Sequence, residues 1–195
     1  MNLALLRKEW LEQRRTFRLW IVIGVLLISG LISPLIARYT PMLLSSLPGV
    51  PPELAAMIPE PTILDSFAQY IKNGSQFGLI VLIVLTMGVM AQEIERGTAA
   101  MLLSKPVSRP AVILSKWASG GLGLLLGQAI GAAGFAFYTL VLFGSFSLAD
   151  FLALNGLLFL FLLFYHTLAL LASSLAHSQS MAAAAAFGGL ILVLI

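Results

Sequence analysis

The chain is 195 residues long, with 59% hydrophobic and only 10% charged residues and a formal net charge of +3. A soluble domain carries about 25% charged residues, and its core could not hide this much apolar surface. The composition excludes an ordinary soluble domain and predicts an all-α, polytopic helical membrane protein. The chain has no cysteine, so disulfides, thiolate metal sites and cysteine nucleophiles are excluded as well.

The first element, residues 1–18, is predicted to be an amphipathic helix on the membrane surface. Five basic residues lie in this segment, and no small-residue cleavage site follows, which argues against a cleavable signal peptide. An apolar stripe should face the lipid, with the charged side chains turned away from it. The stripe comprises Leu3, Leu6, Trp10 and Phe17, and the opposite face Lys8, Glu12 and Arg15.

Four membrane spans are predicted from runs without charged residues, at residues 19–37, 75–91, 117–143 and 151–176. Each approaches or exceeds the roughly 17–25 residues that cross the hydrocarbon core, and residues 144–150 form a turn. A fifth run, 181–195, would reach only about 22 Å of a core that is about 30 Å thick. We therefore expect an incomplete fifth span, with a sixth span beyond Ile195.

The distribution of lysine and arginine predicts the orientation of the chain. Residues 1–18 hold five basic residues and residues 92–116 hold four, whereas the connection 38–74 holds only Arg38 and Lys72. Loops rich in lysine and arginine stay in the cytoplasm. The N-terminus and the segment 92–116 are therefore predicted to be cytoplasmic, and the loop 38–74 external.

The external loop contains six prolines, which break its first half. After them a short helix is predicted from Thr62 to Ile71, with Thr62 as its N-cap. This helix could cover the outer mouth of a pathway or serve only for packing, and the sequence leaves both open.

Enzyme signatures are absent: the sequence has no HExxH, no GxSxG and no phosphate-binding GxxxxGK[ST] motif. The predicted spans also lack the ionisable groups that an intramembrane enzyme or an ion-coupled carrier needs. His166, within the fourth span, is a candidate pathway residue; the alternative is a neutral histidine bonded to a neighbouring helix. No cofactor or metal site is predicted, and nucleic-acid binding is disfavoured because the basic residues flank apolar runs.

The third span carries small residues at strict four-residue spacing: Ser119, Gly123, Gly127 and Gly131. Small residues on one helix face let two helices approach closely. The pattern predicts a tight helix–helix contact within the subunit, with use as a dimer seam as the alternative.

The segment 92–116 combines a charged exit from the membrane with two short helices. The first is predicted at residues 98–103, a proline-marked break follows at 104–106, and the second begins near Pro110 and leads into the third span. A rigid unit continuous with two spans is suited to passing force from a soluble partner into the membrane. An ordinary intracellular loop is the alternative.

This segment resembles the corresponding part of ABC-2 type transporter permeases, where an E-x-E-x-G-T run precedes a Leu-rich turn and an S-[KR]-P-[VI]-S-R sequence. The layout is similar too: an amphipathic "elbow" helix, a span, a variable external loop, a second span, a coupling segment and a third span. That family has six spans per permease, whereas this chain supplies four and most of a fifth. The matching residues are Glu93, Glu95, Arg96, Gly97, Thr98, Leu102, Leu103, Ser104, Lys105, Pro106, Val107, Ser108 and Arg109.

The resemblance implies a permease subunit in the cytoplasmic membrane of a prokaryote, with ATP hydrolysed by a separate ABC ATPase subunit and a second permease copy or paralogue completing the unit. Glu93, Glu95 and Arg96 would be polar docking groups, Gly97 would permit a tight bend, and residues 105–109 would contact the ATPase or lipid headgroups. The coupling set is thus Glu93, Glu95, Arg96, Gly97, Lys105, Pro106 and Arg109.

The substrate is not specified by the sequence, although the apolar spans favour a hydrophobic or amphipathic cargo over an ion. Two other functions stay open. The chain could be a non-transporting membrane scaffold or sensor with the same fold, or a secondary carrier whose ionisable residues lie in further spans.

Overall fold

The computed structural model describes residues 3–46, 59–98 and 107–194, and all regular secondary structure within them is helical. Four stretches are long and apolar enough to cross a membrane: Arg18–Leu43, Ile63–Glu95, Arg109–Phe143 and Leu148–Leu175. The prediction of an all-α polytopic membrane protein is therefore confirmed. The helices are α1 (Leu3–Arg15), α2 (Arg18–Ser45), α4 (Ile63–Thr86), α5 (Gly88–Glu95), α7 (Arg109–Phe143), α8 (Leu148–Leu175) and α9 (Gln179–Leu194).

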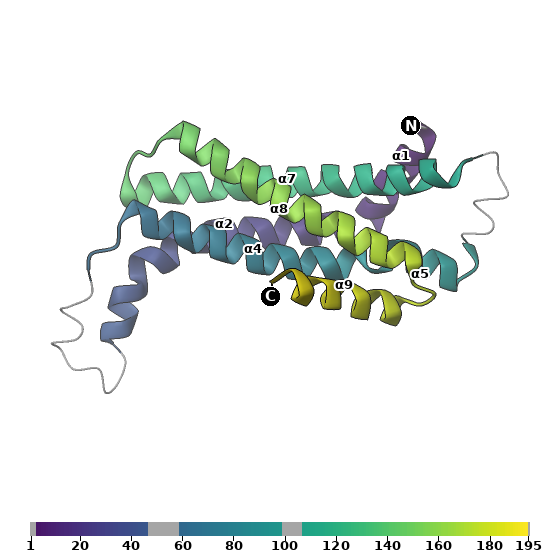
Figure 1. Ribbon diagram of the computed structural model, residues 1–195. Coiled ribbons are helices and arrows are strands. Elements are labelled where there is room, and N and C mark those ends of the chain that lie inside the picture. The colour runs from purple at the N-terminus through teal and green to yellow at the C-terminus, as the bar shows by residue number, and fades with distance from the viewer. Residues whose placement is uncertain (1–2, 47–58, 99–106, 195) are drawn as a thin grey trace.

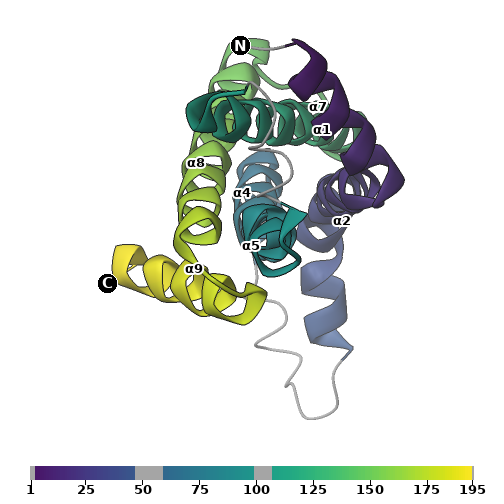
Figure 2. The same cartoon turned by 90° about the vertical axis from the view of Figure 1, so that its right-hand side faces the viewer.

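The long helices form a bundle, with α2 packed against α7 and α4, and α8 against α4 and α7 (Figure 1). Helix α1 crosses one end of this bundle and packs on α7 and α2. The same end gathers α5, the start of α7 and the end of α8, whereas the α7–α8 turn lies at the opposite end. Figure 2, seen from the α1 end, shows α9 beside α8 and α5.

The core of the bundle is an apolar cluster to which all four long helices contribute. Leu26, Ile83, Phe135 and Leu162 are buried at its centre, and the ring of Tyr70 stacks on Phe135 with centroids 4.2 Å apart. Many outward side chains are also apolar, most of all on α8, where only 17% of the most apolar window is buried. An apolar exterior around an apolar core is what a bilayer requires of a helix bundle.

Glycines allow α2 and α7 to approach closely. A Cβ atom on Gly30 would overlap the carbonyl oxygen of Gly131, and a Cβ on Gly131 would lie 2.6 Å from the carbonyl oxygen of Leu26. Gly127 also faces Leu26, and further along the same stripe Gly123 faces Leu19. The small-residue face of α7 therefore packs within the subunit, with its glycines against α2 and Ser119 against Gln13 of α1.

Polar side chains join the helices inside the bundle. Tyr70 on α4 donates to Asn155 on α8 at 2.8 Å, and Gln128 on α7 donates to the same amide oxygen at 2.9 Å. Asn73 on α4 donates to Ser33 on α2 at 3.0 Å. Because lipid offers no hydrogen bonds, these interhelical pairs fix the four helices relative to one another.

Two predicted bounds of the external loop are wrong. Helix α2 continues to Ser45 through Pro34 and Pro41 instead of ending at residue 37, and Figure 1 shows its last turns bending away from the bundle. A proline inside a helix removes one hydrogen bond and bends the helix without always ending it. The predicted helix 62–71 is also not separate, because α4 runs without interruption from Ile63 to Thr86.

Thr62 does begin that helix, as the sequence predicted. The Asp65 carboxylate accepts from both the backbone N–H and the hydroxyl of Thr62, each at 2.7 Å. This is half of a capping arrangement, which satisfies a backbone donor at the helix start.

Near the other end of the bundle, the helix expected to begin near Pro110 and to lead into the third span is found as the first part of α7, which runs from Arg109 with Pro110 in its first turn. Helix α9 begins at Gln179 and has 16 residues, fewer than the four candidate spans. The predicted short helix at 98–103 and the break at 104–106 fall almost wholly outside the described residues.

Candidate functional site

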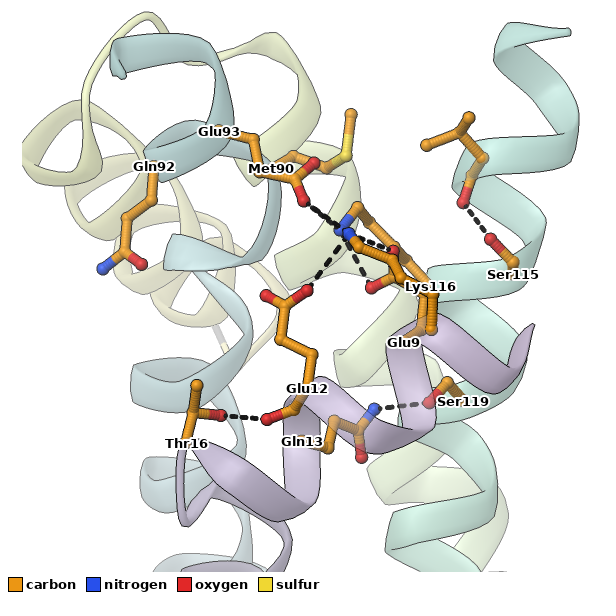
Figure 3. A network of polar contacts seen from close by, with 12 residues as sticks. Glu9, Glu12, Gln13, Thr16, Met90, Gln92, Glu93, Ser115, Lys116 and Ser119 are labelled. Atoms are coloured by element: carbon orange, nitrogen blue, oxygen red, sulfur yellow. Dashed lines mark hydrogen bonds and ion pairs between the residues drawn. The ribbon is translucent and has the colours of Figure 1, made fainter. Parts of the chain in front are cut away.

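Five charged side chains from three helices meet where α1 crosses the bundle (Figure 3). We call them the charged cluster: Lys8, Glu9 and Glu12 of α1, Glu93 of α5 and Lys116 of α7. The three carboxylate groups lie within 4.8 Å of one another, and the two ammonium groups bridge them. The cluster therefore joins the surface helix α1 to both ends of the segment 92–116.

Lys116 is the centre of the charged cluster. Its ammonium nitrogen Nζ lies 2.9 Å from Glu9 Oε2 and 2.9 Å from Glu93 Oε1. The Lys116 side chain is 0% exposed and that of Glu9 is 6% exposed. Removing an ammonium group from water costs several kcal/mol, which only close, hydrogen-bonded carboxylates offset. Lys116 thus holds α1 and α5 against α7.

Lys8 completes the cluster from its exposed side. Its Nζ lies 2.9 Å from Glu9 Oε1, 3.1 Å from Glu12 Oε2 and 3.1 Å from Glu93 Oε1, and its side chain is 43% exposed. Partial burial acts to lower the pKa of Lys8, but the neighbouring carboxylates outweigh it and raise the pKa above its ordinary value. Lys8 is therefore charged throughout the physiological pH range.

Lys8 and Glu12 were expected to turn away from the lipid. They point into the charged cluster, while Leu3 and Phe17 of the predicted lipid-facing stripe are exposed. The sequence pattern indicated this charged face but not that Glu9 of the same helix pairs with Lys116 of α7. Phe17 has φ of 59°, and this residue turns the chain from α1 into α2.

Neutral polar contacts surround the charged cluster and extend it to other helices. Gln13 of α1 donates to Ser119 of α7 at 2.9 Å. Arg18 at the start of α2 donates to Gln92 of α5 at 3.2 Å. Gln92 in turn donates to Gln179 of α9 at 2.9 Å. The beginning of the segment 92–116 is thus tied to α2 and α9 as well as to α1 and α7.

The predicted coupling residues differ in their exposure. Glu93 points inward into the charged cluster, and its side chain is only 16% exposed, so its predicted role as a docking group stays a prediction. Glu95, Arg96 and Arg109 are exposed, and Glu95 Oε2 accepts from the backbone N–H of Gln179 at 3.3 Å.

Gly97 has φ of 71°, a left-handed conformation that favours glycine, which agrees with the predicted bend. Thr98 donates to the Glu93 carbonyl at 3.2 Å just after this bend. Lys105 and Pro106 lie outside the described residues.

The junction between α4 and α5 is held by a serine from α8. The hydroxyl of Ser173 donates to the Met87 carbonyl at 2.6 Å and accepts from the backbone N–H groups of Met90 and Ala91 at 3.0 and 3.1 Å. The backbone of Met87 keeps a helical conformation, with φ of −56° and ψ of −31°. A side chain inserted into the hydrogen bonding of a helix marks a place where that helix can bend.

His166, the predicted pathway residue, is buried on α8, and its Nδ1 lies 3.2 Å from the hydroxyl oxygen of Thr86 on α4. This is the bonding to a neighbouring helix that the sequence offered as the alternative. The ring also lies against Gly120 of α7, so His166 lies where α4, α7 and α8 meet.

Sequence reasoning missed Lys8, Glu9, Glu12 and Lys116 as parts of a site. Lys116 was assigned to the cytoplasmic segment as a basic flank of the third span. Since α7 begins at Arg109, Lys116 lies two turns inside that helix. Two glutamates in an otherwise basic surface helix were the signal that could have indicated a buried cation nearby.

Comparison with known proteins points to one family. Residues 3–195 match the family described as ABC-2 family transporter protein. A Bacillus subtilis (strain 168) protein described as uncharacterized transmembrane protein YxlG is 29% identical over 194 residues, which covers 95% of this chain and 72% of the relative. No solved structure matches the chain.

Proposed function

We propose, from the premise that the chain belongs to the ABC-2 family of transporter proteins, that it is the permease subunit of an ATP-binding cassette transporter. In this proposal the chain lies in the cytoplasmic membrane of a prokaryote with its N-terminus inside. A separate ABC ATPase subunit hydrolyses ATP, and a second permease copy or paralogue completes the transport path. The chain itself carries no catalytic residue and needs no cofactor of its own.

The charged cluster is the observation that carries this proposal. Glu93 lies near the beginning of the segment 92–116 and Lys116 at its end, and their side chains are 2.9 Å apart. Glu9 joins α1 to the same lysine at 2.9 Å. A displacement of this segment by the ATPase would therefore move α5, α7 and α1 together. A loop that only connected two spans would not need a buried ion pair between its ends.

We propose roles within the coupling segment that differ from those expected from the sequence. Glu93 acts as an internal tie between α5 and α7, while the exposed residues Glu95, Arg96 and Arg109 are free to contact the ATPase. Gly97 supplies the bend that follows α5. Docking and force transmission are thus assigned to different side chains.

A matched pair of variants tests this division. The chain is co-expressed with the ABC ATPase encoded beside its gene, the complex is purified, and ATP hydrolysis is compared with that of the free ATPase. We expect the ATPase to co-purify with the wild-type chain. Glu95→Lys should reduce co-purification, whereas Glu93→Gln should leave co-purification intact and remove the effect of the permease on hydrolysis.

Two outcomes contradict the proposal. If no nucleotide-hydrolysing partner co-purifies with the wild-type chain, a non-transporting scaffold or sensor becomes the better assignment. If Glu93→Gln and Glu95→Lys both behave as wild type in assembly and hydrolysis, the segment 92–116 does not couple the two subunits.

The substrate proposed for this permease is hydrophobic or amphipathic. Midway along the bundle the polar groups are neutral amides and hydroxyls, such as those of Tyr70, Gln128 and Asn155. An ion path requires charged groups or a dense array of oxygen ligands. The apolar walls of the spans suit a cargo that partitions into lipid.

A further inference from the structure

A partly open cavity of about 60 Å³ lies beside the charged cluster. Glu9 and Lys116 line it with charged groups, Val22 and Leu82 line it with apolar groups, and His166 also reaches it. The cavity therefore connects the charged cluster at the α1 end with a histidine in the α8 span. None of the roles proposed above for the permease uses this space.

The His166 ring has one nitrogen without a hydrogen bond of good geometry among the described residues, although the Trp117 backbone interacts with the ring. The residue is 5% exposed, and its Nδ1 is paired with Thr86. Its Nε2 is buried and has no hydrogen-bond partner within the described part of the chain. Leaving a buried polar atom unpaired costs about 1–3 kcal/mol, so a partner for Nε2 is expected.

Gly120 gives the imidazole ring of His166 room against α7. A Cβ atom at this position would lie 2.5 Å from His166 Nε2, closer than any real contact allows. Gly120 also lines the cavity. A larger residue at position 120 would push the imidazole from its place beside the cavity.

We propose that this cavity is a binding site for water, and that bound water bridges His166 Nε2 to the charged cluster. A water molecule needs about 10–15 Å³ of such space and two to four polar partners, and the cavity offers both. An apolar ligand would leave Nε2 unpaired. The charged lining residues include Glu9 and Glu12 but also Arg18 and Lys116, so the lining has no net charge that would select an ion.

One consequence is that His166 communicates with solvent from the α1 end of the bundle. Water can donate to or accept from an imidazole nitrogen, so the site serves either neutral tautomer of His166. A continuous polar path then runs from the charged cluster into the membrane-spanning part of the protein. The inference goes beyond the proposed transport function and holds whether or not an ATPase binds.

Magnetic resonance on the full chain in lipid bilayers tests the proposal directly. The sequence has only two histidines, so ¹⁵N-histidine labelling of a His177→Gln variant isolates the signal of His166. We expect magnetisation to pass from water protons to Nε2 of His166. A His166 ring that receives no magnetisation from water, while His177 in the wild-type chain does, overturns the proposal.

Filling the cavity provides the matched comparison. Gly120→Ala should abolish the water contact of His166. The neighbouring Gly121→Ala should retain it, because a Cβ there meets only Leu163 at 3.4 Å. Since Gly120→Ala also pushes on the ring, Val89→Leu fills the cavity from α5 instead and should abolish the contact too. Retention of the water signal in both filled variants contradicts the proposal.

Discussion

The two lysines of the charged cluster share the partners Glu9 and Glu93 but have very different surroundings. Lys116 is wholly buried, whereas the side chain of Lys8 is 43% exposed. We expect Lys116→Met to lower the free energy of unfolding by about 3 kcal/mol, because it leaves Glu9 buried with one cation fewer. The estimate is at the low end of the usual range since Lys8 still pairs with both Glu9 and Glu93. Denaturant titration in mixed micelles measures it.

Lys8→Met is the control and should cost about 0–1 kcal/mol, as for other solvent-exposed pairs. The pKa of Lys8 is raised in the folded state, so the stabilisation that its charge provides is complete below the ordinary pKa of 10.5. It is lost only as the pH rises through the folded-state pKa. The cost of Lys8→Met should therefore be equal at about pH 6 and about pH 8. Equal losses for Lys8→Met and Lys116→Met would show that burial does not govern the cluster.

The inward position of Lys116 could not be predicted from local pattern. Its partner Glu9 is 107 residues away in sequence, and periodicity reports only which residues share a helix face. The positive-inside rule counted Lys116 as a cytoplasmic flank, which predicts its membrane side but not its partner. The bend at Gly97 and the cap at Thr62 were predictable, because each depends on the residue's own backbone preference.

At the scale of elements, the junction of α4 and α5 is the point where the coupling segment meets its span. The hydroxyl of Ser173 makes three hydrogen bonds there, to Met87, Met90 and Ala91. We expect Ser173→Ala to free these backbone groups and to increase amide hydrogen exchange in residues 87–95. Mass spectrometry of peptides covering this range measures the change.

Ser174→Ala is the matched control for that experiment. Among the residues that the structure describes, the Ser174 hydroxyl donates only to the Leu171 carbonyl of its own helix, at 2.8 Å. Exchange in residues 87–95 should therefore stay as in the wild type. Unchanged exchange in Ser173→Ala would mean that α4 and α5 are joined firmly without the serine.

The existence of the long helices was predictable from the sequence, but several of their ends were not. Uninterrupted apolar runs indicated all four long helices, whereas α2 passes through Pro41 and α4 absorbs the predicted helix 62–71. In both cases packing against neighbouring helices supports a continuation that local signals treated as a break. Proline disfavours a helix interior by about 3 kcal/mol, an amount that tertiary contacts can offset.

At the scale of the whole molecule, the predicted orientation can be tested cleanly because the chain has no cysteine. The described ends of the loop before α4 and of the segment before α7 lie at opposite ends of the bundle. We expect a cysteine at Glu60 to react with a membrane-impermeant maleimide in intact cells. A cysteine at Thr98 should react only after permeabilisation.

The labelling distinguishes a wrong membrane orientation from a wrong bundle topology. The reverse pattern would mean that the N-terminus lies outside, which would remove the coupling segment from the cytoplasmic ATPase. Labelling of both positions from one side would contradict the bundle topology itself. The wild-type chain, which lacks cysteine, supplies the background in both measurements.

The length of α7 gives the close contact at Gly131 a mechanical meaning. The helix has 35 residues, about 52 Å at 1.5 Å per residue, and so exceeds a hydrocarbon core of about 30 Å. Gly131 lies roughly 33 Å from the Arg109 end and about 18 Å from the Phe143 end. If α7 pivots as a rigid lever where it touches Gly30, this contact is the fulcrum. Movement of the Arg109 end then drives the Phe143 end the opposite way by roughly half the distance.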